Sequence, residues 1–140
     1  MRAEQHAPWH AARAEYILPS TVVSVGRARQ LTHTFLNRPR RRRAAVGLEC
    51  LDDAALVVSE LMANAVEHGH GQCRLRLIVS HAHVTIAVHD SNPAEPRTSV
   101  ASEDAECGRG MSIVHALAQH LDVLPTRHGP GKTVRAVLVG

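Results

Sequence analysis

A ten-residue stretch near the middle of the chain carries the strongest indication of how the protein folds. It reads Glu60-Leu61-Met62-Ala63-Asn64-Ala65-Val66-Glu67-His68-Gly69. Glu60 and Asn64 are four residues apart, so in a helix they project from one face in adjacent turns. A carboxylate and an amide placed in this way can activate a nucleophile and bind Mg²⁺, because Mg²⁺ prefers oxygen ligands. A solvated helix face is the plainer explanation of the same spacing.

The hydrophobic periodicity on either side of this stretch predicts an α+β protein. It predicts helices over about 22–36, 52–68 and 108–120, and strands over 16–18, 73–79, 84–89, 121–124 and 133–139. Consecutive strands joined by tight turns form antiparallel hairpins, so we expect a two-layer α/β sandwich. Its sheet is mixed and mostly antiparallel, with the helices on one face. We expect a flexible segment over 1–13 and a single domain over 14–140.

The charge of the chain is concentrated in one short run. The formal net charge is +3, and the arginines at positions 38 and 40–43 contribute +5, so all other residues together carry −2. A uniformly basic protein that coats nucleic acid is therefore excluded. With only Trp9, Tyr16 and Phe35 as aromatic residues, the chain also lacks a stacking platform for single-stranded nucleic acid. The arginine run is interpreted as a solvated loop or as a contact for an acidic partner.

Other compositional features point to a soluble cytoplasmic protein. No apolar run approaches the roughly 18–20 residues that cross a membrane, and the first residues have no signal-peptide core. Cys50, Cys73 and Cys107 are odd in number and widely spaced, so we expect reduced thiols rather than disulfides or a zinc knuckle. The closely spaced histidines at 68 and 70 and at 81 and 83 lack a third partner, so they predict no structural metal site.

Three further motifs follow the first one along the chain. They are His89-Asp90-Ser91-Asn92-Pro93, Gly108-Arg109-Gly110-Met111 and Gly131-Lys132-Thr133-Val134. The first ends a strand in a carboxylate, and the second places two glycines at a predicted helix start, where backbone N–H groups can meet an anion. The third lacks the spacing of a phosphate-binding P-loop and opens a strand. Each motif alone also fits an ordinary turn or loop.

Taken together, in this order and spacing, the four motifs resemble the N, G1 and G2 boxes and the terminal threonine of the GHKL (Bergerat-fold) ATPases. The resemblance covers residues 15–139. Within that superfamily the sequence is most similar to the small anti-sigma-factor serine/threonine kinases and to the related ATP-binding regulators of actinobacteria. It implies a histidine-kinase-like ATPase fold and ATP with Mg²⁺ as ligands.

The resemblance also implies a role for each motif residue. Glu60 is the general base, Asn64 binds the Mg²⁺ that bridges the phosphates, and Asp90 accepts a hydrogen bond from the adenine amino group. Thr133 supports the adenine through water. The phosphates are met by the second glycine motif, whose members are Gly108, Arg109, Gly110 and Met111. The loop over 91–107 corresponds to the lid over the nucleotide.

One departure from the family pattern leaves the activity open. The G1 box usually reads Asp-x-Gly-x-Gly, whereas here it reads Asp90-Ser91-Asn92-Pro93-Ala94, with neither glycine. Pro93 stiffens the start of the lid. Two functions therefore stand side by side. The first is a Mg-ATP-dependent serine kinase acting on an anti-anti-sigma (STAS-domain) protein. The second is a catalytically weak, nucleotide-gated module that binds a sigma factor or another regulator. Such kinases are commonly homodimers.

Overall fold

The structure is a computed structural model. It describes residues 12–38, 48–67, 71–80, 82–91, 105–127 and 129–139, with the backbone alone described at 48–49 and 105–110. The elements follow one another as β1 (Ala12–Pro19), α2 (Val22–Leu36), α4 (Leu48–Glu67), β2 (Gln72–Ser80), β3 (His83–Asp90), α5 (Ala105–Leu117), β4 (His120–Pro125) and β5 (Lys132–Val139).

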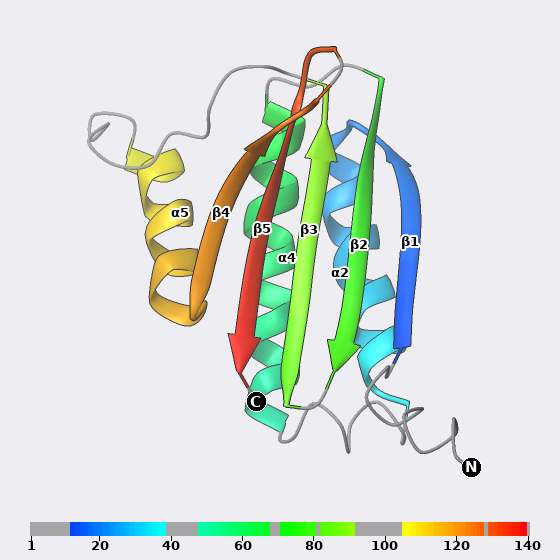
Figure 1. The fold of residues 1–140 in the computed structure, drawn as a ribbon, viewed down its shortest axis with the longest axis vertical. Coiled ribbons are helices and arrows are strands. Elements are labelled where there is room, and N and C mark those ends of the chain that lie inside the picture. Colours follow the sequence, from blue (N-terminus) through cyan, green and yellow to red (C-terminus); the bar gives the residue numbers. More distant parts are fainter. Residues whose placement is uncertain are drawn as a thin grey trace.

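The five strands form a single sheet in the order β1-β2-β3-β5-β4, and every pair of neighbours is antiparallel. Helices α2 and α4 lie behind this sheet in Figure 1, and α5 lies beside the edge strand β4. The α+β two-layer sandwich predicted from the sequence is confirmed. The end of β3, the start of β5 and the end of α4 all lie at the upper end of the molecule in this view.

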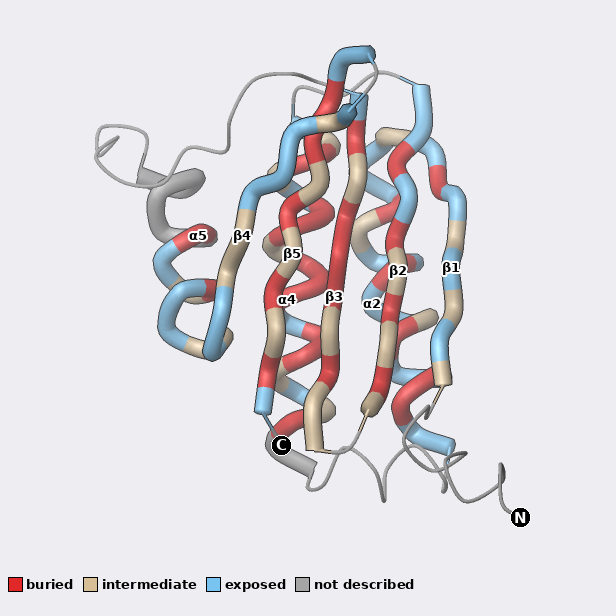
Figure 2. The backbone as a smooth tube through the Cα atoms, viewed as in Figure 1, coloured by how far each residue is buried: buried red, intermediate tan, exposed pale blue. Residues whose placement is uncertain are grey.

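The hydrophobic core lies between the sheet and the helices, as the buried segments in Figure 2 show. Alternate residues of each central strand point into it. In β2 these are Cys73, Leu75, Leu77 and Val79, and in β3 they are Val84, Ile86 and Val88. Helix α4 closes the core from the other side and packs on β3 and β5 as well as on α2 and α5.

The opposite face of the sheet is polar. There Glu15 of β1 lies 3.3 Å from Arg74 and 3.6 Å from Arg76 of β2. Arg135 of β5 likewise donates a hydrogen bond to Asp122 of β4 at 2.9 Å. These ion pairs are about half exposed, so each contributes little to stability. A sheet with one apolar and one polar face accounts for the period-two pattern of the strands.

Several elements differ in extent from the predictions. Strand β1 begins at Ala12 rather than at Tyr16, because it is held by pairing with β2 along its whole length rather than by its own weak pattern. Helix α4 begins at Leu48, ahead of the predicted start near residue 52, and ends at Glu67. Helix α5 covers 105–117 instead of 108–120, and the residues from His120 belong to β4.

The first predicted helix has the predicted bounds, and small and polar residues make up much of its buried face. Val22, its first residue, is 79% exposed. The buried residues of the helix are Ser24, Ala28, Thr32, Phe35 and Leu36. Thr32 can be buried because its hydroxyl donates to the Ala28 carbonyl at 2.8 Å. No helix in the described ranges is long and apolar enough to cross a membrane.

Candidate functional site

Helix α4 carries the predicted carboxylate and amide. Glu60 and Asn64 lie one turn apart toward the end of the helix, and both side chains are partly exposed. Their neighbours Val57 and Leu61 are buried in the core and hold this stretch of helix against the sheet. The two polar groups are therefore placed on a rigid support, and both offer oxygen atoms of the kind that Mg²⁺ prefers.

Asp90 is the last residue of β3 and points to the same side as the core. The alternation of the strand places its side chain in line with Ile86 and Val88, on the face covered by the helices. The side chain is only 1% exposed. A carboxylate removed from water in this way requires compensating hydrogen bonds or an opposite charge.

Lys132 supplies that opposite charge. It is the first residue of β5 and lies directly across from Asp90 in the antiparallel register. Its Nζ donates to both Asp90 Oδ1 and Asp90 Oδ2, each at 3.2 Å, and the side chain is 6% exposed. No role was expected for this lysine from its motif. The sequence does indicate where its side chain points. Val134, Ala136 and Leu138 are apolar, so the even-numbered residues of β5, including Lys132, are expected to face the core.

The predicted threonine lies elsewhere. Because strand side chains alternate, Thr133 points to the polar face of the sheet, opposite to Asp90 and Lys132. There its Oγ1 lies 3.0 Å from Nδ1 of His89, the residue across from it. The structure thus does not bring the Thr133 side chain to Asp90, and Lys132 occupies the position beside that carboxylate.

The second glycine motif lies inside α5 rather than at its start. Since the helix begins at Ala105, Gly108 is its fourth residue and Gly110 its sixth. The N–H groups without a partner in a helix belong to its N-cap and its first three residues, so those of Gly108 and Gly110 both lie in the helical ladder. Two glycines weaken a helix without preventing it, and Ala105 favours one. Met111 is buried in the core.

Other parts of the predicted site lie outside the described residues. They include most of the expected lid (92–104), with Asn92, Pro93 and Ala94 of the G1 box, and the side chain of Arg109. The same holds for the arginines at 40–43, the histidines at 68, 70 and 81, and the segment 1–11. Among the residues that are described, no three His, Cys, Asp or Glu side chains group to hold a metal ion.

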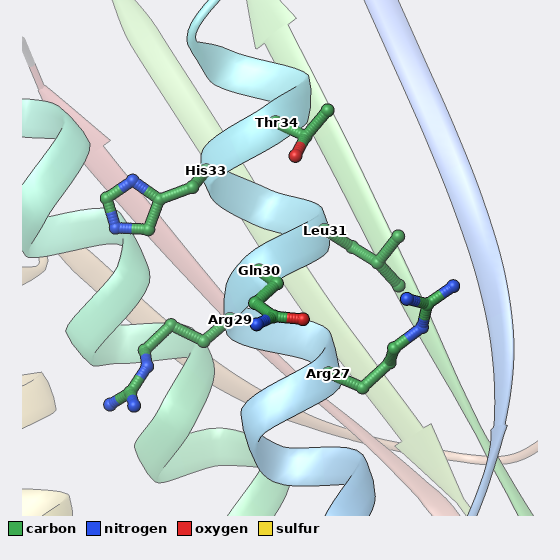
Figure 3. A pocket seen from close by; sticks show the side chains of 6 residues that line it. All are labelled: Arg27, Arg29, Gln30, Leu31, His33 and Thr34. Atoms are coloured by element: carbon green, nitrogen blue, oxygen red, sulfur yellow. The ribbon is translucent and has the colours of Figure 1, made fainter.

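A hollow of about 450 Å³ lies on the outer surface of α2, away from these residues (Figure 3). Its walls are formed by side chains of one helix only, namely Arg27, Arg29, Gln30, Leu31, His33 and Thr34. None of the predicted nucleotide-site residues contributes to it.

Comparison with known proteins identifies the family. The model of the histidine kinase-like ATPase domain matches residues 18–138, which is most of the chain. The protein therefore belongs to the histidine kinase-like ATPase domain family, and the expected relation to the GHKL superfamily is confirmed. No curated protein matches the sequence.

Among solved structures, the chain is similar to the histidine kinase domain of the blue-light activated histidine kinase from Erythrobacter litoralis EL346. The match has a TM-score of 0.52 and 22% sequence identity, and covers 86% of this chain. It spans 61% of the length of that chain. At this identity the likeness bears on the fold, and it confirms the predicted histidine-kinase-like ATPase fold.

Proposed function

We propose that the protein binds ATP together with Mg²⁺ at the end of the molecule where β3 ends. Buried Asp90 carries this proposal, because a carboxylate shielded from water and aimed into the helix-covered side of the sheet can select a base by its amino group. Such a contact is selective because a base that carries an acceptor in place of the amino group would be repelled by the carboxylate, which can only accept hydrogen bonds. Membership of an ATPase domain family supports the same ligand.

The oxygen atoms of Glu60 and Asn64 on α4 are suited to a magnesium ion that is bound together with a nucleotide. Glu60 and Asn64 present oxygen atoms one turn apart and partly exposed, whereas the described residues contain no group of three acidic, cysteine or histidine side chains. Mg²⁺ is commonly held by one or two protein oxygens together with substrate phosphates. In this arrangement Asn64 holds the ion.

The finer proposal is a protein serine kinase that acts on an anti-anti-sigma (STAS-domain) partner. It rests on the resemblance of the motifs, and the chemistry requires little beyond positioning and charge stabilisation. The partner's serine oxygen attacks the γ-phosphorus, the bond to ADP breaks, and the serine proton passes to the Glu60 carboxylate. The second candidate is a nucleotide-gated module that binds a sigma factor or regulator without transfer. It is favoured by the absence of glycine at positions 92 and 94.

Nucleotide binding is tested by calorimetric titration of ATP with and without Mg²⁺. We expect wild type to bind, and Asp90→Asn to bind at least about tenfold more weakly, because a charged acceptor is lost. Asp122→Asn is the matched control, since this carboxylate is also paired with a basic residue of β5 but lies half-exposed on the other face. Wild type without detectable affinity for ATP or ADP would contradict the proposal.

The kinase and the binding module are separated by transfer of label from γ-labelled ATP to STAS-domain proteins encoded nearby in the genome. For a kinase, Glu60→Gln removes the general base, so transfer falls by roughly 10²–10⁴-fold while ATP still binds. Asp52→Asn, an exposed carboxylate of the same helix, retains transfer. If wild type binds ATP but transfers no label to any such protein, the module without transfer is the better description.

A further inference from the structure

The buried pair of Asp90 and Lys132 joins a hydrogen-bond acceptor to a donor at one end of the sheet. The two residues face each other across β3 and β5, and the lysine Nζ is equally close to both carboxylate oxygens. Both side chains are almost completely shielded from water. The carboxylate can only accept hydrogen bonds and the ammonium can only donate them. The pair therefore presents both kinds of group within a few ångströms.

The turn that precedes Lys132 is fitted tightly around this pair. Gly131 has φ +117°, and a Cβ atom at this position would lie 2.5 Å from the backbone oxygen of Asp90 and 3.1 Å from Thr126 Oγ1. Thr126 Oγ1 is buried and makes no hydrogen bond within the described part of the chain. A buried hydroxyl without a partner is uncommon in folded proteins. The Thr126 hydroxyl can therefore still form a hydrogen bond at this end of the sheet.

The donor and acceptor match the edge of adenine. The exocyclic amino group of adenine is a donor, and the adjacent ring nitrogen N1 is an acceptor. An acceptor and a donor side by side in the protein can engage both at once, with the amino group on one Asp90 oxygen and N1 on Lys132 Nζ. The lysine then keeps the other carboxylate oxygen, so the pair need not separate. Hypoxanthine presents the same two positions with donor and acceptor exchanged.

We propose that Lys132 is a specificity-determining residue that donates a hydrogen bond to N1 of the adenine ring, beside the contact made by Asp90. This inference rests on the proposed function, since it concerns the base of the same nucleotide. It assigns to Lys132 the position that the motif comparison had given to Thr133. It also means that the base is read by two charged side chains on adjacent strands.

The test compares ATP with 1-deaza-ATP, in which the N1 nitrogen is replaced by a C–H group. Calorimetric titration of wild type should give 1-deaza-ATP an affinity about ten- to hundredfold lower, as expected for a lost hydrogen bond to a charged donor. Inosine triphosphate should also bind more weakly than ATP. In Lys132→Met the preference for ATP over 1-deaza-ATP should disappear. Arg135→Met removes a charge from the polar face of the same strand and should retain the preference.

The outcomes separate this inference from the proposed function. If wild type binds no ATP, both are overturned. If wild type binds ATP and 1-deaza-ATP equally, the contact with N1 is overturned while nucleotide binding stands. Stronger binding of ATP by Lys132→Met would likewise overturn it, because the lysine would then compete with the base for Asp90. Should this variant fail to fold, the comparison of the two nucleotides on wild type still decides.

Discussion

At the scale of single residues, the turn between β4 and β5 depends on a glycine with no room for a side chain. Gly131 combines a positive φ of +117° with a backbone oxygen 2.5 Å from where a Cβ would lie. The backbone N–H of Thr126 closes this turn by donating to the Gly131 carbonyl at 3.2 Å. A side chain at position 131 would therefore push the start of β5, including Lys132, away from the end of β3.

We expect Gly131→Ala to lose roughly 2–5 kcal/mol in the free energy of unfolding, measured by urea denaturation. Backbone strain and the clash with Asp90 both contribute. Gly129→Ala is the matched control, because Gly129 also has positive φ, at +97°, but no atom of the described residues, its chain neighbours aside, lies within 4 Å of its Cβ position. It should lose only about 1–3 kcal/mol. Equal losses in the two variants would show that the clash is relieved by a shift of the turn.

The thiols of Cys50 and Cys73 provide a second prediction at this scale. Burial is the main cause that raises the pKa of both thiols, with Asp53 and Asp90 respectively acting in the same direction. A raised pKa leaves less thiolate at a given pH, and the thiolate is the reactive form. At pH 8 both cysteines should therefore be alkylated at least about tenfold more slowly in the native protein than in urea.

Mass spectrometry of the alkylated peptides measures each cysteine separately. Ser20→Ala offers an internal comparison, since Ser20 Oγ lies 3.1 Å from Cys73 Sγ and this hydrogen bond lowers the pKa of that thiol. Its removal should slow alkylation of Cys73 further and leave Cys50 unchanged. Native and unfolded protein reacting at the same rate would contradict the burial of these thiols.

At the scale of elements, helix α4 connects the core to the candidate site. One flank carries Glu60 and Asn64, while residues between them and on either side pack against the sheet and the other helices. A helix anchored in this way positions its polar groups more accurately than a loop can. Loss of core packing along α4 should therefore disturb the site as well as the stability.

We expect Leu61→Ala to reduce the free energy of unfolding by about 2–5 kcal/mol, because Leu61 is 1% exposed and its removal leaves a cavity. Leu56→Ala, on the same helix but 39% exposed, should change it by no more than about 1 kcal/mol. Urea denaturation of the two variants provides the measurement. A similar loss in both variants would show that Leu61 is not buried more deeply than Leu56, in contradiction to the structure.

The elements also show where local patterns are sufficient. Helix α2 has the predicted bounds, and both strands of the β2–β3 hairpin were predicted to within one residue at either end, because their apolar and polar residues alternate regularly. Strand β1 and helix α5 are among the elements that differ most from prediction. The first is stabilised by pairing with β2, and the second by burial of Met111 and Val114. These stabilising contacts come from residues far away along the chain, so no local pattern reveals them.

At the scale of the whole molecule, the sheet has a covered face and an open one. Helices shield one side, whereas the other side bears the ion pairs of Glu15 and Asp122 and the contact of His89 with Thr133. This division decides which motif residues can meet. Asp90 and Lys132 share the covered side, and Thr133 lies on the other side although it follows Lys132 directly in the sequence.

Hydrophobic periodicity and motifs in a fixed order were enough to predict the fold class, the order of the elements and the family. The sequence also singled out Glu60, Asn64 and Asp90 by their residue types. Only the tertiary structure decided that Lys132 and not Thr133 lies beside Asp90. That choice depends on strand register, where a shift of one residue moves a side chain to the opposite face of the sheet.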